Sequence, residues 1–381
     1  DRQAPAAKLM KNILLFLLVL ALIGTTVLWV RHGGGAPYPD LSTAPALNSS
    51  SLEQVLEYPE PVGNVAVNRD GRLFFTVHPE SRPTGNKLLE FVRGAAVPFP
   101  SGADQSALFD TVLGVAIDRF NRLWTIDHGN HGTRPARIVA IDLDTNVVIR
   151  EQYLPPEIAP LGSYLQDLQV SADGRTIIIA DTSFWRKSPG IVVYDIETGE
   201  ARRVLESHAS VSAENYMIRN GGREMEFLGG IVALRGGIDG IALGPEWLYF
   251  GALNGSGLYR VRLSDLRNEK LPPGQLANRV ERFSDKPLSD GFSIDVGGSV
   301  YITDVEHSSI FVVSQEQGLK TLINSPKMRW PDGLSFGPDG YLYIADSALP
   351  ELILQSSEHI EAKGPYRVFR FSPGVEGVPG Q

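Results

Sequence analysis

Six stretches of the chain share one pattern, and this internal repeat constrains the fold more than any other feature of the sequence. Each stretch is a short apolar strand, a turn with Asp-Gly, Asn or Gly, and a second strand rich in Val, Ile, Tyr, Phe and Trp, which is typical of a β-hairpin. Third and fourth strands follow, such as IVVYDIETG (191–199) and RRVLES (202–207). The six stretches begin at Val62, Val112, Tyr164, Gly237, Leu288 and Trp330. Four strands in each of six units predict an all-β fold, a six-bladed β-propeller.

The two ends of the repeat array complement each other. The last unit has a third strand, YRVFRFSP (366–373), but no convincing fourth strand after it. LEQVLEYPEP (52–61), just before the first unit, resembles a fourth strand. The sequence therefore predicts one propeller over residues 52–381, with the N-terminal strand completing the last blade and removing an open sheet edge.

The N-terminal region carries a long apolar segment. Lys8 and Lys11 precede the run at residues 12–30, which fits either the apolar part of a signal peptide or a membrane span of roughly 20 residues. No clear cleavage motif follows Val30, which favours an uncleaved anchor whose lysine end stays in the cytoplasm. We therefore expect an anchor or signal at residues 1–32, a linker rich in Gly, Pro and Ser at 33–51, and an extracytoplasmic propeller, periplasmic or secreted.

Composition and motifs exclude several classes of function. The net charge is −9, with no basic run beyond the N-terminus, which argues against nucleic acid as a partner. Without cysteine there are no disulfides, thiolate metal sites or cysteine nucleophiles. Residues 333–337 match G-x-S-x-G, the pattern of a nucleophile elbow, which requires a strand-to-helix turn. Ser335 falls within an expected innermost strand, so it is not predicted to be a nucleophile. The expected partners are a small molecule and, through the N-terminal segment only, a membrane; a monomer is favoured.

The tripeptide Pro-Asp-Gly occurs twice in the last repeat, at residues 331–333 and 338–340. Asp339 falls in the turn between the first and second strands, where Asp and Gly suit a tight backbone, and is expected to be structural. Asp332 comes just before the innermost strand, at the mouth of the channel on the opposite face. The equivalent positions of the other repeats hold Asn64, Gly114, Asp167, Asp239 and Asp290.

Four carboxylates and an amide around one narrow axis would repel one another unless a cation or protons intervened. Oxygen ligands that converge from several directions suit Ca²⁺. Asp239, Asp290, Asp332 and Asn64 are therefore predicted metal ligands, and Asp167 a ligand-binding residue. The alternative is that each aspartate accepts hydrogen bonds from the backbone where its strand starts.

The loops between second and third strands are expected on the same face. They carry Asp127 with His128, and Asp304 with His307. A histidine beside a metal-lined channel suits a general base, so His307 and His128 are predicted catalytic residues, with the alternative that they only stabilise their loops. Four further residues are predicted to contact the ligand: Asp127, Asp304, Trp330 and Trp185.

One connection is much longer than the others. Residues 207–237, between the third and fourth repeats, enter on the face of the channel mouth. They could form a lid that holds Tyr216, Met217, Arg219 and Arg223 near the opening, or a hairpin that decorates the outside.

Several motifs carry a family resemblance across most of residues 51–381. IADTSFWRKSPGIVVYDIETGEARRVL, GGIDGIALGPEWLYFGALNGSGLYRVRLSDLRNE and RWPDGLSFGPDGYLYIADS resemble the yellow and major royal jelly protein family in its bacterial form. More distantly, the fold and the Asp and Asn positions at the mouth are similar to gluconolactonases and related calcium-dependent lactonases. The lactonase pattern has a metal-binding Glu on the first blade, where this chain has Asn64.

The resemblance implies a six-bladed propeller and a location outside the cytoplasm. Yellow-type relatives include proteins that bind biogenic amines in the channel, pigment-pathway proteins credited with dopachrome conversion, and nutritive or signalling proteins. Two classes of function follow. One is binding of a small molecule in the channel, with or without Ca²⁺. The other is hydrolysis of a lactone or ester, in which Ca²⁺ would polarise the carbonyl group.

Overall fold

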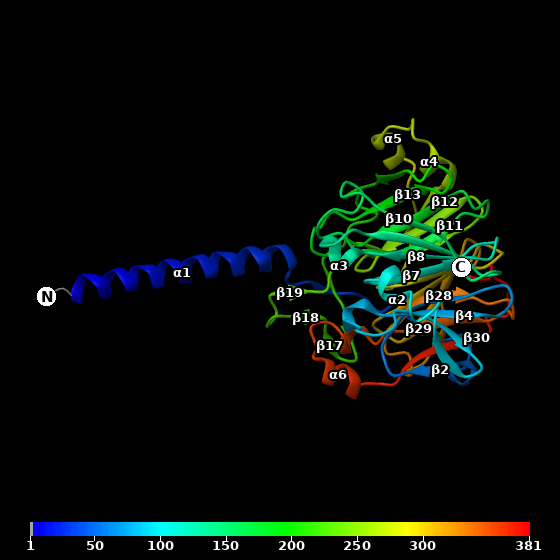
Figure 1. Cartoon of the computed structure of the whole chain (residues 1–381), viewed down its shortest axis with the longest axis horizontal. Coiled ribbons are helices and arrows are strands. Elements are labelled where there is room, and N and C mark those ends of the chain that lie inside the picture. Colours follow the sequence, from blue (N-terminus) through cyan, green and yellow to red (C-terminus); the bar gives the residue numbers. More distant parts are fainter. Residues whose placement is uncertain (1–2) are drawn as a thin grey trace.

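The computed structural model describes residues 3–381, with side chains from residue 8 onward, and it contains a six-bladed propeller of four-stranded antiparallel blades (Figure 1). The predicted fold is thereby confirmed. From the axis outward, the first blade is β3 (Val62–Val67), β4 (Leu73–Val77), β5 (Leu88–Val92) and β6 (Ala95–Pro98). The second is β7 (Val112–Ile117), β8 (Arg122–Asp127), β9 (Arg137–Asp142) and β10 (Val147–Tyr153). The third is β11 (Leu165–Val170), β12 (Thr176–Asp181), β13 (Gly190–Asp195) and β14 (Ala201–Val204).

The remaining blades follow the same order. The fourth is β20 (Ile238–Leu243), β21 (Trp247–Ala252), β22 (Gly257–Arg262) and β23 (Glu281–Asp285). The fifth is β24 (Phe292–Ile294), β25 (Val300–Asp304), β26 (Ser309–Ser314) and β27 (Gly318–Asn324). The sixth is β28 (Pro331–Phe336), β29 (Leu342–Asp346), β30 (Tyr366–Phe371) and, from the N-terminal side, β2 (Glu53–Tyr58).

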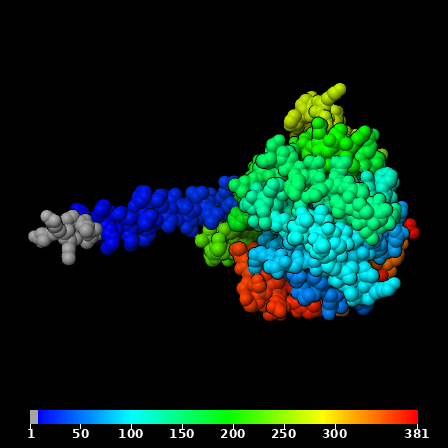
Figure 2. Space-filling model, in the orientation of Figure 1, coloured from blue at the N-terminus to red at the C-terminus, as the bar shows by residue number. Residues whose placement is uncertain are grey.

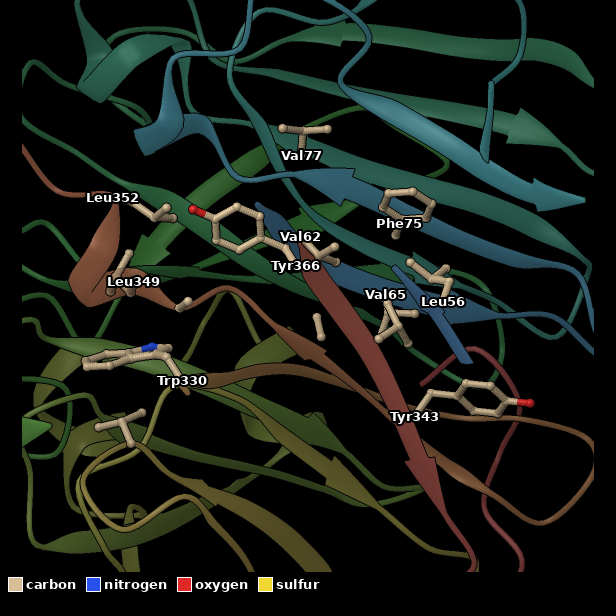
Figure 3. Packing of buried hydrophobic residues seen from close by; sticks show 14 of the residues in the cluster. Leu56, Val62, Val65, Phe75, Val77, Trp330, Tyr343, Leu349, Leu352 and Tyr366 are labelled. Atoms are coloured by element: carbon tan, nitrogen blue, oxygen red, sulfur yellow. The ribbon is translucent and has the colours of Figure 1, made fainter. Parts of the chain in front are cut away.

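β2 closes the ring as predicted. It pairs antiparallel with β30, from Glu53 opposite Arg370 to Tyr58 opposite Tyr366. Apolar side chains of the sixth and first blades pack together beside this seam, with Leu56, Val62 and Phe75 in one cluster (Figure 3). Similar clusters fill the spaces between the other blades. The closing strand is therefore part of the core.

The residues after β30 cover the end of the channel opposite the mouth. Ile117 donates its backbone N–H to the carbonyl of Gly380 (2.9 Å), and Phe336 donates to that of Gln381 (2.9 Å). The side-chain amide of Gln381 donates to the carbonyl of Val170 (2.9 Å). These bonds join the innermost strands of the second, third and sixth blades, so the C-terminal residues lie across the end of the channel opposite the mouth.

The long connection between the third and fourth blades folds into short strand pairs. These are β15 (Tyr216–Met217), β16 (Arg219–Asn220), β17 (Arg223–Glu224), β18 (Glu226–Phe227) and β19 (Val232–Ala233). Short helices occupy other loops: α2 (Gln105–Leu108), α3 (Gly129–Gly132), α4 (Leu263–Arg267), α5 (Pro273–Ala277) and α6 (Ser357–Ala362). In Figure 1, α3, α6 and β17 to β19 lie on the face from which the N-terminal helix leaves, opposite the C-terminus.

The N-terminal helix α1 (Gln3–His32) stands out from the mouth face as a single rod (Figure 2). Within residues 8–32, an 18-residue window has a mean hydropathy of 2.8 and is not buried, so the helix is long and apolar enough to cross a membrane. The predicted linker after it is bound to the propeller. β1 (Ala36–Pro37) pairs with β15, and Leu47 donates its N–H to Leu322 of β27 (2.8 Å).

Candidate functional site

Three aspartates of the channel mouth, Asp167, Asp239 and Asp332, lie at bulges in the innermost strands, whereas Asp290 precedes β24. In β20 the pairing with the second strand shifts register between Ile238 and Ile241, so Asp239 lies outside the ladder. β28 shifts in the same way between Pro331 and Leu334, around Asp332. A bulge re-aims side chains, here toward the axis. The sequence placed Asp332 just before its strand; it lies inside β28, because the bulge lets the strand continue past it.

The glycine that follows Asp239, Asp290 or Asp332 is required because there is no space for a side chain. A Cβ atom at Gly291 would overlap the backbone carbonyl oxygen of Asp332 on the next blade. At Gly240 it would lie 2.6 Å from the carbonyl oxygen of Asp290, and at Gly333 it would overlap the side chain of Asn64. Asp-Gly therefore serves two purposes at the mouth: the aspartate faces the channel, and the glycine lets neighbouring innermost strands approach each other.

Burial raises the pKa of all four channel aspartates. The pKa rises to about 7 at Asp167 and to about 6 at Asp290. At Asp239 and Asp332 burial and the nearby charge of Asp290 raise the pKa well above its usual range. Burial and mutual repulsion therefore both favour the protonated form of the carboxyl groups of Asp239 and Asp332.

The ring has the oxygen chemistry that Ca²⁺ prefers, but its arrangement does not fit the ion. Asp290 Oδ2 accepts a hydrogen bond from Trp330 Nε1 (2.6 Å), and Asn64 Oδ1 accepts one from the N–H of Val65 (2.7 Å). Within residues 3–381, no three His, Asp or Glu side chains converge as a metal site requires. We derive no metal-dependent step from this arrangement.

A pocket of ≈ 830 Å³, counting the part that opens to solvent, lies above the aspartate ring. Its walls are apolar and come from loops of the third and sixth blades and from the insertion. They include Phe184, Trp185, Phe227, Leu228, Val232, Leu234, Leu253, Leu349, Ile353 and Leu354. Its floor is polar, formed by His78, Glu80, His131, Tyr164, Gln166, Thr182, Asp239 and Asp290.

The insertion is a lid over this pocket, the first of the two alternatives left open by the sequence. Phe227 and Leu234 reach the pocket, whereas Tyr216, Met217, Arg219 and Arg223 do not line it. The lid is fastened across the mouth: the side-chain amide of Asn220 donates to the carbonyls of Val305 (2.6 Å) and Arg329 (2.8 Å). These contacts join the fourth-blade connection to the fifth and sixth blades.

Two histidines of the pocket floor are held by Glu80. Its carboxylate contacts His131 Nε2 (2.9 Å), and its backbone N–H donates to His78 Nδ1 (3.2 Å). Because His78 Nδ1 accepts, its proton lies on Nε2, which is 3.9 Å from Asp332 Oδ2. Burial raises the pKa of Glu80, but the hydrogen bond from His131 and the charges of His131, His78 and His128 together outweigh it and lower the pKa to about 2. Glu80 therefore adds a negative charge to the pocket.

The two histidines predicted to be catalytic do not line the pocket. His307 Nδ1 bonds Asp304 (2.9 Å), and this hydrogen bond raises its pKa to about 9. It is protonated at neutral pH and cannot accept a proton there. His128 is fully buried, and burial lowers its pKa to about 3. Its Nδ1 accepts the N–H of His131 (2.9 Å), so His128 positions a pocket residue from behind.

Three of the predicted ligand-binding residues have structural contacts. Asp127 accepts backbone N–H groups from Asp110 (2.6 Å) and Gly129 (3.0 Å), which ties two loops together. Asp304 holds its own loop through the N–H of Glu306 (2.9 Å). Trp330 is completely buried in the core (Figure 3), and its Nε1 donates a hydrogen bond to Asp290 Oδ2 (2.6 Å). Trp185 does line the pocket, and Asp167 lines a small polar cavity below it.

Sequence reasoning missed most of the pocket floor. His78 and His131 could have been found by their positions near the ends of second strands, where four of the seven histidines lie: His78, His128, His131 and His307. Glu80, Tyr164 and Gln166 carry no comparable signal, because their roles depend on how the loops fold.

Comparison with known proteins settles the family. The family model described as Major royal jelly protein matches residues 110–363, more than half of the chain. The chain belongs to the major royal jelly protein family. It is 24% identical over 228 residues to Major royal jelly protein 3 of Apis mellifera, a match that covers 54% of this chain and 38% of the relative. The chain thus spans about two fifths of that relative's length.

Solved structures share the fold at low sequence identity. A calcium-binding protein, regucalcin, from Agrobacterium tumefaciens aligns over 89% of this chain and 98% of its own, with a TM-score of 0.55 and 15% identity. A gluconolactonase from Xanthomonas campestris aligns over 84% of this chain and 88% of its own, with a TM-score of 0.51 and 15% identity. At such identity the likeness extends to the propeller and no further.

Proposed function

We propose that this family member binds a small organic cation, an amine with an apolar body, in the pocket at the channel mouth. The observation that carries the proposal is an acidic floor beneath apolar walls. Asp239 lines the pocket, and its Oδ1 is buried without a hydrogen-bond partner among the described residues. A buried oxygen of this kind is costly unless a donor reaches it.

An ammonium group would serve as that donor. Bound near Asp239 and Asp290, it would replace the proton that burial now retains there and would offset their mutual repulsion. The ring of Tyr164 and the aromatic wall at Phe184 and Trp185 offer cation–π and apolar contacts to the same molecule. Binding should therefore strengthen as the pH rises through the raised pKa of Asp290, about 6, where that carboxyl group loses its proton.

The propeller is proposed to work outside the cytoplasm, attached by α1. The end of the helix supports an uncleaved anchor, because His32 is buried against Phe184 and Trp185 of the pocket wall. Cleavage before the propeller would remove this packing.

Calcium-dependent hydrolysis of a lactone or ester is the second candidate. The oxygen-rich lining of the channel mouth favours it, as do neighbours described as a gluconolactonase and a calcium-binding protein. One argument against it is that Asp290 Oδ2 and Asn64 Oδ1 already accept hydrogen bonds, from Trp330 and Val65 respectively. Neither predicted general base, His307 or His128, reaches the pocket.

Thermal unfolding and calorimetry of the full chain in detergent test both candidates. The probes are 2-phenylethylamine, its neutral analogue 2-phenylethanol, and Ca²⁺, and the proteins are wild type, Asp239→Asn and, as a control on the opposite face, Asp339→Asn. We expect the amine to bind wild type and Asp339→Asn, Asp239→Asn to bind at least about tenfold more weakly, and the alcohol not to bind.

Equal binding of amine and alcohol, or none of the amine, would contradict the cation proposal. A rise in melting temperature with Ca²⁺, together with calcium-dependent hydrolysis of a lactone panel, would replace it with the second candidate.

A further inference from the structure

The last turn of α1 is built into the rim of the channel mouth. Arg31 donates to the carbonyl of Arg186 (2.8 Å), and Arg235 donates to the carbonyl of Arg31 (3.3 Å). His32 packs on Trp185 with ring centroids 5.5 Å apart. α1 also contacts β19 of the lid. The last turn of α1 is therefore attached directly to the pocket wall. The direction of α1 determines the orientation of the channel mouth.

The apolar part of α1 ends at this rim. The run at residues 12–30 is about 28 Å long as a helix, close to the roughly 30 Å of a bilayer's hydrocarbon core. Trp29, half exposed, lies one turn before the rim, and Trp185 lies on the rim itself. Tryptophan concentrates at membrane–water interfaces. If α1 crosses a membrane, the membrane–water interface begins within two residues of His32, which packs against the pocket wall.

Exposed leucines surround the same opening. Leu228 is at the tip of the lid, Leu354 follows the short helical turn at Leu349–Glu351, and Leu161 lies in the loop before β11. Each is more than half exposed. Figure 2 shows the lid (green) projecting from the propeller beside the base of α1. Apolar tips on separate loops around one face suit insertion into an apolar phase.

Cations cluster between these tips and the helix. Arg31, Arg186, Lys187 and Arg235 meet around the last turn of α1, where Lys187 Nζ donates to the carbonyl of Arg235 (2.8 Å). Glu206 pairs with Arg186 and offsets part of this charge. Burial, then the charges of Arg235 and Arg31, lowers the pKa of Lys187 to about 7. Lipid phosphates at this depth would relieve that crowding.

We infer that the rim of the channel mouth is a membrane-docking surface: the leucine tips enter the bilayer that α1 crosses, and the pocket opens onto lipid. This extends membrane contact beyond the N-terminal segment expected from the sequence. Such a pocket would take amphiphilic molecules that partition into the bilayer. The inference depends on α1 as the anchor and does not depend on what the pocket binds.

Lipid-borne quenchers can test the surface, because the chain contains no cysteine of its own. Single cysteines would replace Leu161, Leu228 or Leu354, each labelled with a fluorophore, in full chain reconstituted into nanodiscs with nitroxide-labelled lipids. Val27→Cys in α1 is the positive control. Phe120→Cys and Val296→Cys, exposed in turns between first and second strands on the opposite face, are the matched controls.

We expect strong quenching at positions 27, 161, 228 and 354, and at least about threefold less at 120 and 296. Quenching at 27 with rim labels no more quenched than those at 120 and 296 would overturn the docking surface and leave the anchor standing. Absence of quenching at 27 would refute the anchor and the docking surface together.

Discussion

The tripeptide Pro-Asp-Gly has different structural roles at the two ends of the propeller. At the mouth, Asp332 is buried among carboxyl groups, and Gly333 lies against the side chain of Asn64 with an ordinary backbone conformation. On the opposite face, Gly340 has a φ of 75° and nothing within 4 Å of a Cβ position, and Asp339 pairs with Arg370 (3.0 Å) in partial contact with solvent. Gly333 is required because a side chain there would overlap Asn64, whereas Gly340 is favoured by its positive φ.

The largest effect should come from filling the space that a mouth glycine leaves. Gly291→Ala would force the neighbouring innermost strands apart, because the new methyl group meets backbone, and should lower the free energy of unfolding by about 3 kcal/mol or more. Gly340→Ala, which meets no atom, should cost only about 1 kcal/mol through its positive φ. Denaturant unfolding measures the loss of unfolding free energy in both variants. Equal losses would contradict the distinction between the two glycines.

The second effect is a pH dependence that arises at the mouth. A carboxyl group with a raised pKa binds its proton more tightly in the folded chain than in the unfolded chain. Stability should therefore fall as pH rises from the unfolded value of 3.8 through the folded value of about 7 for Asp167.

Asp167→Asn should remove about 2 kcal/mol of that loss between pH 5 and 8, since asparagine does not ionise. Unfolding free energies measured across this range test it. An unchanged pH slope in the variant would mean that Asp167 ionises normally.

The smallest effect should be that of Asp339→Asn. It weakens one partly exposed ion pair and keeps the turn, so we expect a loss of at most about 1 kcal/mol. Because Asp339 is not part of the ring, the pH slope should match that of wild type. A slope as altered as that of Asp167→Asn would show that the two faces are electrostatically coupled.

The fold could be predicted because a blade is a local pattern that repeats. Alternating apolar strands and Asp-Gly turns specify each hairpin, and the missing fourth strand after residue 373 indicated the role of residues 52–61. The same equivalence between repeats located the channel aspartates, including Asp239 and Asp332.

The pocket could not be predicted in the same way, because loops outside the repeat form it. Phe227 and Leu234 belong to an insertion with no counterpart in other blades, and the contact between Glu80 and His131 joins loops of two blades. The interior contacts of Trp330 and Asp127 could not be predicted, because a repeat shows position along a blade but not burial. Both are satisfied by interior contacts that only the folded chain reveals.

β2, which closes the ring, is the first strand of the propeller blades to be synthesised and the last to find its partner. Glu53 of β2 meets Arg370 of β30, 317 residues later in the chain. Each blade before the sixth is built from consecutive strands and can form as it is synthesised, whereas this pairing must wait until nearly the whole chain exists. Non-local pairings of this kind are slow to form. A nascent or truncated chain therefore keeps two unpaired strand edges, and completing synthesis becomes the step that completes the fold.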